Sequence, residues 1–314
     1  MYERRTANRN QLQANDFPEM PSTSLTGHML TFDVEEFFQV ESAAKQISRD
    51  DWPAYEKRLA PCVDRILALL ADHQASATFF VLGWVAKYEP DIVRRIVVAG
   101  HEIASHGTDH KMLQHLTPHD LLQDLLESKN VLEDISGKAV IGYRAPTFSI
   151  TRGTSWALDV LIEAGFLYDS SIFPIRHDRY GIPEAPRRPH SAVGPAGGTI
   201  LEIPPLTTRA MGINWPIGGG GYLRLLPVQM VSAVLRTAQA RREPAMLYLH
   251  PWELDKDQPV LPMSQLNQWR HRLGLGRTES KLRFLLRRHT FRSVQAMLPA
   301  LSRRLHEQFV YSTV

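Results

Sequence analysis

Three carboxylates stand within four positions of this sequence, directly after a short apolar run at residues 29–32. They belong to Asp33, Glu35 and Glu36. In an extended strand alternate side chains point the same way, so Asp33 and Glu35 would lie on one face. Two carboxylates on one face repel each other unless a cation or a proton lies beside them. An isolated Asp-x-Glu usually ends a strand in a solvated acidic turn, so this stretch alone does not establish a site.

Two histidines further along the chain change that balance. His106 and His110 stand at positions i and i+4 in the segment Ser-His-Gly-Thr-Asp-His. Both imidazoles can reach one ion if this turn is helical or tightly coiled. Two imidazoles and one carboxylate with an open coordination position are a common catalytic zinc arrangement, in which Glu35 would supply the carboxylate. The histidines alone are equally typical of a polar loop, but together with the acidic strand end they favour a metal site.

Three further side chains could complete a hydrolytic site around such an ion. A bound divalent ion lowers the pKa of its water, and Asp33 is then the natural general base for that water. Arg144 could hold Asp33 ionised and oriented, and His250 could protonate a leaving group. Taken singly, Arg144 is typical of a surface turn and His250 of a buried structural histidine. The same ligand set also suits a non-haem iron oxygenase, which has no evident use for these extra groups.

The elements that must position these residues alternate between short strands and helices. Strands are predicted at 29–32, 77–82, 101–105, 140–143, 166–168, 200–203 and 245–249, and helices at 53–74, 90–100, 118–136, 154–164, 227–241 and 280–288. This alternation predicts parallel strands joined by helical crossovers. Residues 173–198 are predicted to be a long loop, and the glycine run at 218–221 a flexible substrate-covering loop or a linker.

The candidate residues all fall at or just after the C-terminal ends of predicted strands. They are Asp33, Glu35, His106, His110, Arg144, Asp169 and His250. In a closed or nearly closed β/α barrel those strand ends meet at one mouth, where active sites lie. The placement therefore predicts a single site assembled from distant parts of the chain.

Bulk composition indicates a globular protein with a large core. The chain has 314 residues, of which 43% are hydrophobic and 22% charged. Its single cysteine, Cys62, excludes an intrachain disulfide framework and a cysteine-rich zinc site. No apolar run approaches the length needed to span a bilayer, and the polar N-terminus lacks the apolar core of a signal peptide. We therefore expect a mobile tail at 1–27 and a cytoplasmic protein.

Positive charge is concentrated near the C-terminus. Ten Lys or Arg and two acidic residues lie between Trp269 and Phe309, a local charge of +8, so the rest of the chain sums to −5. We expect residues 266–314 to form a basic extension docked on the barrel. The short basic amphipathic helix at 280–288 is predicted to dock as well, with peripheral contact at the inner face of a membrane as the alternative. A solvated face, an anionic glycan and nucleic acid are the other interpretations of this charge.

Four motifs together resemble the NodB-homology polysaccharide deacetylases, carbohydrate esterase family 4. The resemblance spans about residues 28–252 and is carried by Thr31–Glu35, Ser105–His110, Tyr143–Pro146 and Leu247–His250. The Asp-Val-Glu-Glu and His-Pro-Trp-Glu variants, with the basic tail, resemble the subgroup encoded beside bacterial exopolysaccharide and exosortase loci. The resemblance implies an α/β fold, a distorted (β/α) barrel of seven or eight parallel strands over residues 28–265.

The resemblance also implies an activity and a role for each residue. The expected reaction removes acetyl from N-acetylhexosamine units of a bacterial polysaccharide or a lipid-linked oligosaccharide, with no nucleic-acid partner. The implied catalytic residues are Asp33 as base, His250 as acid, Arg144 orienting the base and the backbone N–H of Thr147 stabilising the oxyanion; the implied metal ligands are Glu35, His106 and His110. The expected cofactor is a divalent metal, zinc first, with cobalt, nickel or manganese as alternatives.

This sequence departs from the family pattern at three points. The second acid, Glu35, stands two positions after Asp33 rather than next to it, so Glu36 could be the ligand instead. Thr147 occupies a position that is commonly aromatic. Residues 216–240 contain no aspartate to tune His250, and Asp169 is the substitute candidate.

Aromatic residues could provide platforms for sugar rings. The candidates are Trp215, Tyr222 and Trp252, with Tyr143 of the third motif as a further substrate-binding residue; singly, each is more often part of a core. Two other functions stay open at this point. One is an allantoinase-like hydrolase of small C–N compounds, and the other is a catalytically inactive scaffold that binds glycan.

Overall fold

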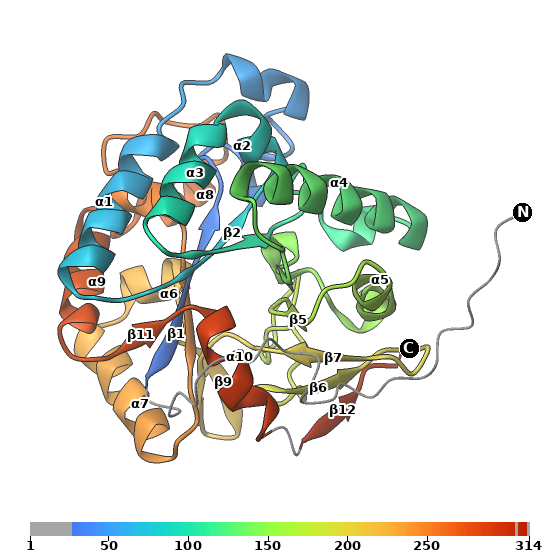
Figure 1. Cartoon of the computed structure of the whole chain (residues 1–314). Coiled ribbons are helices and arrows are strands. Elements are labelled where there is room, and N and C mark those ends of the chain that lie inside the picture. The colour runs from blue at the N-terminus through green and yellow to red at the C-terminus, as the bar shows by residue number, and fades with distance from the viewer. Residues whose placement is uncertain (1–26, 305–306, 313–314) are drawn as a thin grey trace, which may run out of the picture.

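The computed structural model describes residues 27–304 and 307–312 of the chain. The predicted N-terminal tail at 1–27 therefore lies outside the described residues, apart from Gly27. In the described part, one curved sheet forms the centre and helices cover its outer side (Figure 1). None of the described helices combines the length and the apolar character needed to cross a membrane.

The central sheet has ten strands, most of them parallel. Its order is β10-β1-β2-β3-β4-β5-β7-β6-β12, and β11 pairs with the first residues of β1. The strands are β1 (His28–Val34), β2 (Thr78–Val81), β3 (Glu102–Ser105), β4 (Gly142–Tyr143), β5 (Tyr168–Asp169), β6 (His190–Val193), β7 (Thr199–Glu202), β10 (Met246–Leu249), β11 (Phe291–Arg292) and β12 (Gln308–Val310). From β10 to β7 every neighbouring pair is parallel, whereas β6 is antiparallel to β7. The predicted α/β class with parallel strands is confirmed.

The curved sheet approaches a barrel, but no ladder joins β7 to β10 among the described residues. Two isolated parallel bridges lie in that gap, Pro205 with Met246 and Gly219 with Tyr248. Gly219 has φ +150°, and a Cβ at this position would lie 1.7 Å from the carbonyl oxygen of Tyr248. Only glycine allows so close a backbone approach. The glycine run therefore packs against β10 and leads into the helix Gly220–Leu225, and Gly220 and Gly221 line the cavity described below.

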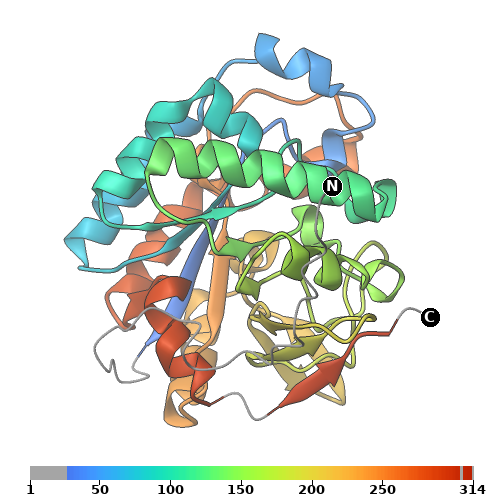
Figure 2. The same cartoon turned by 45° about the vertical axis from the view of Figure 1, so that its right-hand side comes forward.

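Helices join the parallel strands from β1 to β5 and precede β10, as the alternation predicted, whereas β5, β6 and β7 follow one another without a helix. They are α1 (Leu59–Asp72), α2 (Gly83–Tyr88), α3 (Pro90–Val98), α4 (Pro118–Ser136), α5 (Ala157–Glu163), α6 (Gly220–Leu225), α7 (Val228–Ala240), α8 (Gln265–Arg272), α9 (Thr278–Leu286) and α10 (Val294–Ser302). The longest, α4, crosses the outer side of the sheet (Figure 2). It begins with a capping box between Thr117 and Asp120 and ends at Gly137, whose φ of +65° is the left-handed value that stops a helix.

Several local predictions were wrong at their edges. The helix predicted from residue 53 begins at Leu59, because Pro53 lies in a separate 3₁₀ turn, Arg49–Ala54. The segment 173–198, predicted as loop throughout, contains strand β6. Residues 207–216, for which no element was predicted, form a two-stranded hairpin of β8 (Thr207–Ala210) and β9 (Ile213–Pro216).

The C-terminal segment is packed into the same body. Strand β11 extends the sheet beside β1, and β12 pairs with β6 at the far edge (Figure 2). In α9, Leu282 and Leu285 are fully buried. The ammonium group of Lys281 donates to the carbonyls of residues 223, 224 and 226 at the end of α6, at 2.9, 2.7 and 2.8 Å. The predicted division of the chain at residue 265 stays a prediction.

Candidate active site

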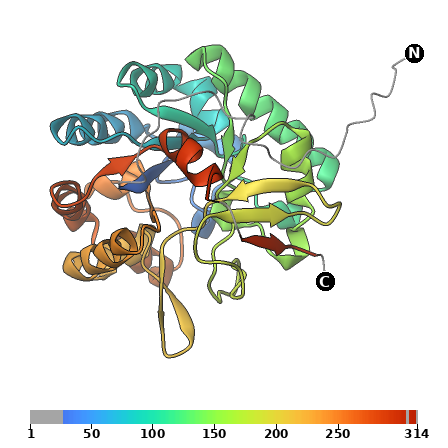
Figure 3. The same cartoon turned by 60° about the horizontal axis from the view of Figure 1, so that its bottom comes forward.

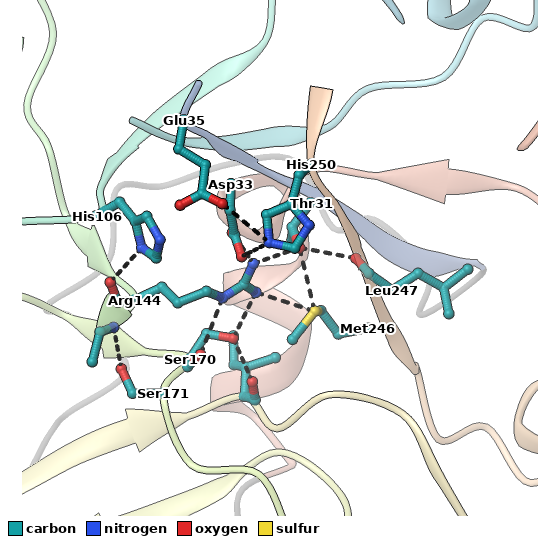
Figure 4. Close-up of polar contacts among 12 residues, drawn as sticks. Thr31, Asp33, Glu35, His106, Arg144, Ser170, Ser171, Met246, Leu247 and His250 are labelled. Atoms are coloured by element: carbon teal, nitrogen blue, oxygen red, sulfur yellow. Dashed lines mark hydrogen bonds and ion pairs between the residues drawn. The ribbon is translucent and has the colours of Figure 1, made fainter. Parts of the chain in front are cut away.

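The predicted site residues converge where β1, β3, β4 and β10 end. Figure 4 shows Asp33 and Glu35 facing His250, with Arg144 below and His106 beside them. All five are buried or nearly so, with His250 the most accessible. The sheet brings these strand ends together because Val34 pairs with Val81, and Val81 with Ser105, across neighbouring parallel strands. A register of this kind places residues that follow each strand at one end of the barrel.

Three side chains form a cluster that could hold a metal ion. One ligand atom from each of Glu35, His106 and His110 lies within 4.8 Å of the others. The Nδ1 of His106 hydrogen-bonds the backbone carbonyl of Arg144 at 2.8 Å, which leaves Nε2 free for an ion. Burial is the largest influence on His106 and lowers its pKa to about 4, so the ring is neutral, as a ligand must be. The Nε2 of His110 is 2.8 Å from Oε2 of Glu35.

The turn that carries both histidines is tight rather than helical. Gly107 has φ +75° and His110 φ +52°, so the backbone leaves the right-handed helical region at both positions. The turn is held from outside by Asp124 of α4, whose carboxylate accepts the backbone N–H of Thr108 at 3.1 Å. The two imidazole centroids are 5.3 Å apart as a result. The expectation that a tight coil would bring the pair together matches this geometry.

Glu35 and Glu36, adjacent in sequence, have opposite surroundings. The pKa of Glu35 would be raised by burial, but His110, His250 and His106 outweigh that effect and lower it. Glu36 points to the start of α1, where its Oε1 accepts the backbone N–H groups of Arg58 and Leu59 at 2.8 and 3.1 Å. Burial, then Glu89, raises the pKa of Glu36 to about 7. The geometry therefore assigns Glu35 to the cluster and gives Glu36 the role of a helix cap.

Arg144 is fully buried and holds Asp33 directly. Its Nη1 donates to Oδ1 of Asp33 at 2.5 Å and to the hydroxyl of Thr31 at 2.9 Å. Its Nε and Nη2 donate to the carbonyl and hydroxyl of Ser170, at 3.1 and 2.9 Å (Figure 4). The guanidinium also lies over the ring of Phe80, 4.0 Å from its centroid. These contacts exclude the surface-turn interpretation and fix the Asp33 carboxylate in one orientation.

His250 lies between the acid pair and a second carboxylate that the sequence reasoning missed. Its Nε2 is 3.8 Å from Asp33 and 3.7 Å from Glu35, and its Nδ1 is 3.4 Å from Oε1 of Glu253. Burial alone would lower the pKa of His250, but Glu253, Glu35 and Asp33 raise it to about 9. Glu253 is itself fully buried against Arg224, with Nε 3.3 Å from Oε1. These three carboxylates therefore favour the charged form of the imidazole.

Glu253, backed by Arg224, lies beside His250, where Asp169 had been the candidate to tune the pKa of that histidine. Asp169 lies elsewhere, in register with Glu202 across β5 and β7, and its carboxylate accepts a hydrogen bond from Ser171 at 2.5 Å. The only available signal for Glu253 was its spacing of three residues from His250 in His-Pro-Trp-Glu. A 3₁₀ turn at Pro251–Leu254 converts that spacing into contact. Arg224 follows the glycine run and carried no signal of its own.

Trp252 supports the cluster instead of offering a free face to a sugar. It is 5% exposed, and the rings of His250 and His271 stack on it at centroid distances of 5.1 and 4.5 Å. Its Nε1–H donates to Oε1 of Glu35 at 3.2 Å. Hydrogen bonds of this kind orient a metal ligand. The structure thus places Trp252 behind Glu35, where the sequence had suggested a platform.

A cavity of about 640 Å³ opens over these residues. Thr147, with φ +56°, and Tyr222 both line it. Tyr143 does not line it, being buried against Phe166 with 1% of its surface exposed. Trp215 lies on the β8–β9 hairpin and is not among the lining residues either. Of the four predicted substrate-binding residues, Tyr222 and Trp252 line the cavity, whereas Tyr143 and Trp215 do not.

Comparison with known proteins gives two adjacent family matches. Residues 43–166 match the family described as polysaccharide deacetylase, and residues 170–299 match a domain of unknown function, DUF3473. A peptidoglycan deacetylase of Helicobacter pylori is 32% identical over 110 residues, which are 35% of this chain and 36% of that protein. A chitooligosaccharide deacetylase of Rhizobium leguminosarum bv. trifolii is 32% identical over 100 residues, 32% of this chain and 44% of that protein.

The aligned regions are partial, and the structural likeness is modest. The chain spans less than half the length of these two relatives. The structure of the peptidoglycan deacetylase PdaC from Bacillus subtilis aligns with a TM-score of 0.46 and 12% identity, covering 90% of this chain and 95% of that one. The deacetylase match includes both histidines of the cluster and Arg144, whereas Asp33, Glu35 and His250 lie outside its bounds. The resemblance drawn from the four motifs is confirmed.

Proposed function

The chain carries a polysaccharide deacetylase domain of the NodB-homology family, and on this premise we propose that it is a metal-dependent amide hydrolase. The proposed reaction removes acetyl from N-acetylhexosamine units of a bacterial exopolysaccharide or of its lipid-linked precursor. The observation that carries the proposal is the meeting of Asp33 held by Arg144, a ligand cluster and His250 close to three carboxylates within one cavity.

The donor set fits a divalent cation. Glu35, His106 and His110 would hold it, because one ligand atom of each of these buried side chains lies within 4.8 Å of the others. Two imidazoles and one carboxylate are ligands that zinc prefers, and cobalt, nickel and manganese accept the same set. When bound, the cation would supply Lewis-acid polarisation of the amide carbonyl and lower the pKa of a water.

Asp33 and His250 would then move the protons. Asp33, held by Arg144 as the carboxylate, accepts a proton from the attacking water. The water oxygen adds to the acetyl carbonyl, and the backbone N–H of Thr147 at the cavity wall supports the developing oxyanion. His250 gives its proton to the sugar nitrogen as the C–N bond breaks. The products are acetate and a free amino sugar.

The test is acetate release by the purified, metal-loaded chain. N-acetylglucosamine oligomers and the polymer of the source organism should release acetate, and Asp33→Asn should abolish the release without loss of metal. A panel of cyclic amides such as allantoin, assayed in parallel, would detect the small-molecule hydrolase. If no glycan and no cyclic amide is turned over, the chain is a binding scaffold and the proposal is wrong.

A further inference from the structure

The β8–β9 hairpin projects from the body of the molecule. In Figure 3 it is the gold loop that extends away from the sheet and helices. Its tip is a tight turn at Met211 and Gly212, whose φ values are +53° and +77°. The hairpin is held on one side by Asn214, two residues after Gly212, whose amide donates to the carbonyls of Pro174 and Pro183 at 2.8 and 3.1 Å. It is therefore a stiff element with an exposed end.

The exposed end is apolar. Met211 is 94% exposed, Ile213 54% and Trp215 50%. Ile213 pairs directly with Ala210, and Trp215 with Thr208, so these four side chains share one face of the hairpin. Single exposed apolar residues are ordinary, but three on one projecting hairpin, with no acidic residue in it, mark a contact surface.

Arginines without partners surround the base of the same hairpin. A cavity of about 1340 Å³ lies between the hairpin, the end of α7 and residues 183–189. Four arginines that line it, Arg176, Arg187, Arg209 and Arg241, form no ion pair within the part of the chain that the structure describes. The acids on its wall are already engaged, because Glu243 and Glu307 pair with Arg188 and Glu184 pairs with Arg152. The surface thus has a surplus of free guanidinium groups.

We propose that the hairpin tip and these arginines form a docking surface for an anionic phospholipid bilayer. Guanidinium groups bind phosphate through paired hydrogen bonds, and an anionic membrane surface attracts them. Trp215 has the amphipathic ring that is enriched at membrane interfaces. Met211 and Ile213 have aliphatic side chains, which suit the boundary of the acyl chains and offer nothing that a sugar ring requires.

This surface is separate from the catalytic one and from the basic helix at the C-terminus. Ala245 and Met246, at the start of β10, line the arginine cavity, whereas His250 follows the end of that strand. No residue lines both cavities. Helix α9, which the sequence offered for membrane contact, has its apolar side packed inward at Leu282 and Leu285. Docking through the hairpin does not depend on the proposed hydrolysis.

Sedimentation with lipid vesicles tests the proposal on the full chain. The protein should bind vesicles of phosphatidylcholine and phosphatidylglycerol, and binding to phosphatidylcholine alone should be far weaker. Replacing the tip by M211S/I213S should weaken binding roughly tenfold or more, and each of R187Q and R241Q roughly fivefold. The matched control Val98→Ser removes another exposed apolar side chain, 88% exposed on α3, and should leave binding unchanged.

A fluorescent label reports insertion directly. Cys62 is the only cysteine and is buried, so a cysteine placed at position 211 or 98 can be labelled selectively with an environment-sensitive fluorophore. Anionic vesicles should blue-shift the label of Met211→Cys and not that of Val98→Cys. Equal shifts at both sites, or tip variants that bind like wild type, would overturn the proposal. So would a wild-type dimer that M211S/I213S dissociates, or tight binding to an anionic polysaccharide without vesicle binding.

Discussion

Two pairs of buried carboxylates lie at the C-terminal ends of strands in this sheet, and they have opposite characters. Asp33 lies near the end of β1 and Glu35 directly follows that strand, while Asp169 and Glu202 end β5 and β7 in register with each other. Burial is the largest influence on Glu35, Asp169 and Glu202 alike. It is outweighed at Glu35, whose pKa is lowered, but it raises the pKa of Asp169 and, well above its usual range, that of Glu202.

The difference lies in what surrounds each pair. Arg144 holds Asp33 in the first pair, and three histidines lower the pKa of Glu35. Among the described residues the second pair has no such cation: Oδ2 of Asp169 and Oε2 of Glu202 are buried without a donor, as expected where two carboxyls share one proton. Buried acids at strand ends therefore do not by themselves identify a catalytic site. The basic groups that accompany them do.

The comparison is sharpest when the same change is made in each pair. Asp33→Asn should lower deacetylase turnover by roughly a thousandfold or more, because an amide cannot accept the proton. Asp169→Asn should leave turnover within about threefold, because an amide can still hydrogen-bond Glu202. Turnover on N-acetylglucosamine oligomers measures both. Equal losses in the two variants would show that the second pair also takes part in the chemistry.

Metal content should distinguish the two ends of one strand. His106 follows β3 and His101 precedes it; both are buried, and burial lowers the pKa of each to about 4. His106→Gln should reduce metal affinity by roughly a hundredfold, whereas His101→Gln should bind as wild type does. Metal analysis after dialysis against a weak chelator gives the result. Full metal retention by the His106 variant would contradict the assigned ligand set.

The third acid, Glu253, should act on the pH profile more than on folding. Glu253→Gln removes a negative charge that favours the imidazolium of His250, so the pKa of His250 should fall from about 9. The alkaline limb of the activity profile should then move to lower pH, with a loss of roughly tenfold at the optimum. Rate against pH for wild type and variant is the measurement. A uniform loss with an unmoved limb would indicate a structural role only.

The smallest effect concerns stability and belongs to the second pair. Because the folded-state pKa of Glu202 is raised, its contribution to stability is complete below the unfolded pKa and is lost as pH rises. Each pH unit in that window costs about 1.4 kcal/mol per proton. Glu202→Gln, whose amide can donate to Asp169, should flatten this dependence between mildly acidic and neutral pH. Calorimetric unfolding across that range would detect it, and parallel curves for the two proteins would contradict the shared proton.

Most of the parallel sheet and the convergence of the site could be predicted from the sequence. Short apolar runs ending in Asp33, His106, Arg144 and His250 are sufficient for that, because parallel strands bring their C-terminal ends together. What could not be predicted depends on side-chain direction after a strand ends. Glu36 turns toward α1 although it adjoins Glu35. The alternation of a strand does not fix the direction of a side chain once the strand has ended.

The remaining errors lie where tertiary contacts, and not the local sequence pattern, decide the structure. The glycine run lacks side chains, so its pattern resembles a linker, while the structure uses it for close contact with β10. The face that Trp252 presents is decided by stacking against His271 of α8, a contact that no local pattern indicates. The hairpin at 207–216 has apolar residues that face outward, and hydrophobic patterning assigns such residues to a core.

One residue spans the two halves of the chemistry. The guanidinium of Arg144 donates a hydrogen bond to Asp33, the proposed proton acceptor. The backbone carbonyl of Arg144 hydrogen-bonds the ring of His106. The backbone carbonyl remains when Arg144 is substituted, whereas the guanidinium group is lost. Shortening the side chain should therefore leave the metal-binding cluster intact and release the Asp33 carboxylate from its fixed orientation. Loss of catalysis and loss of metal would then be separable at this one position.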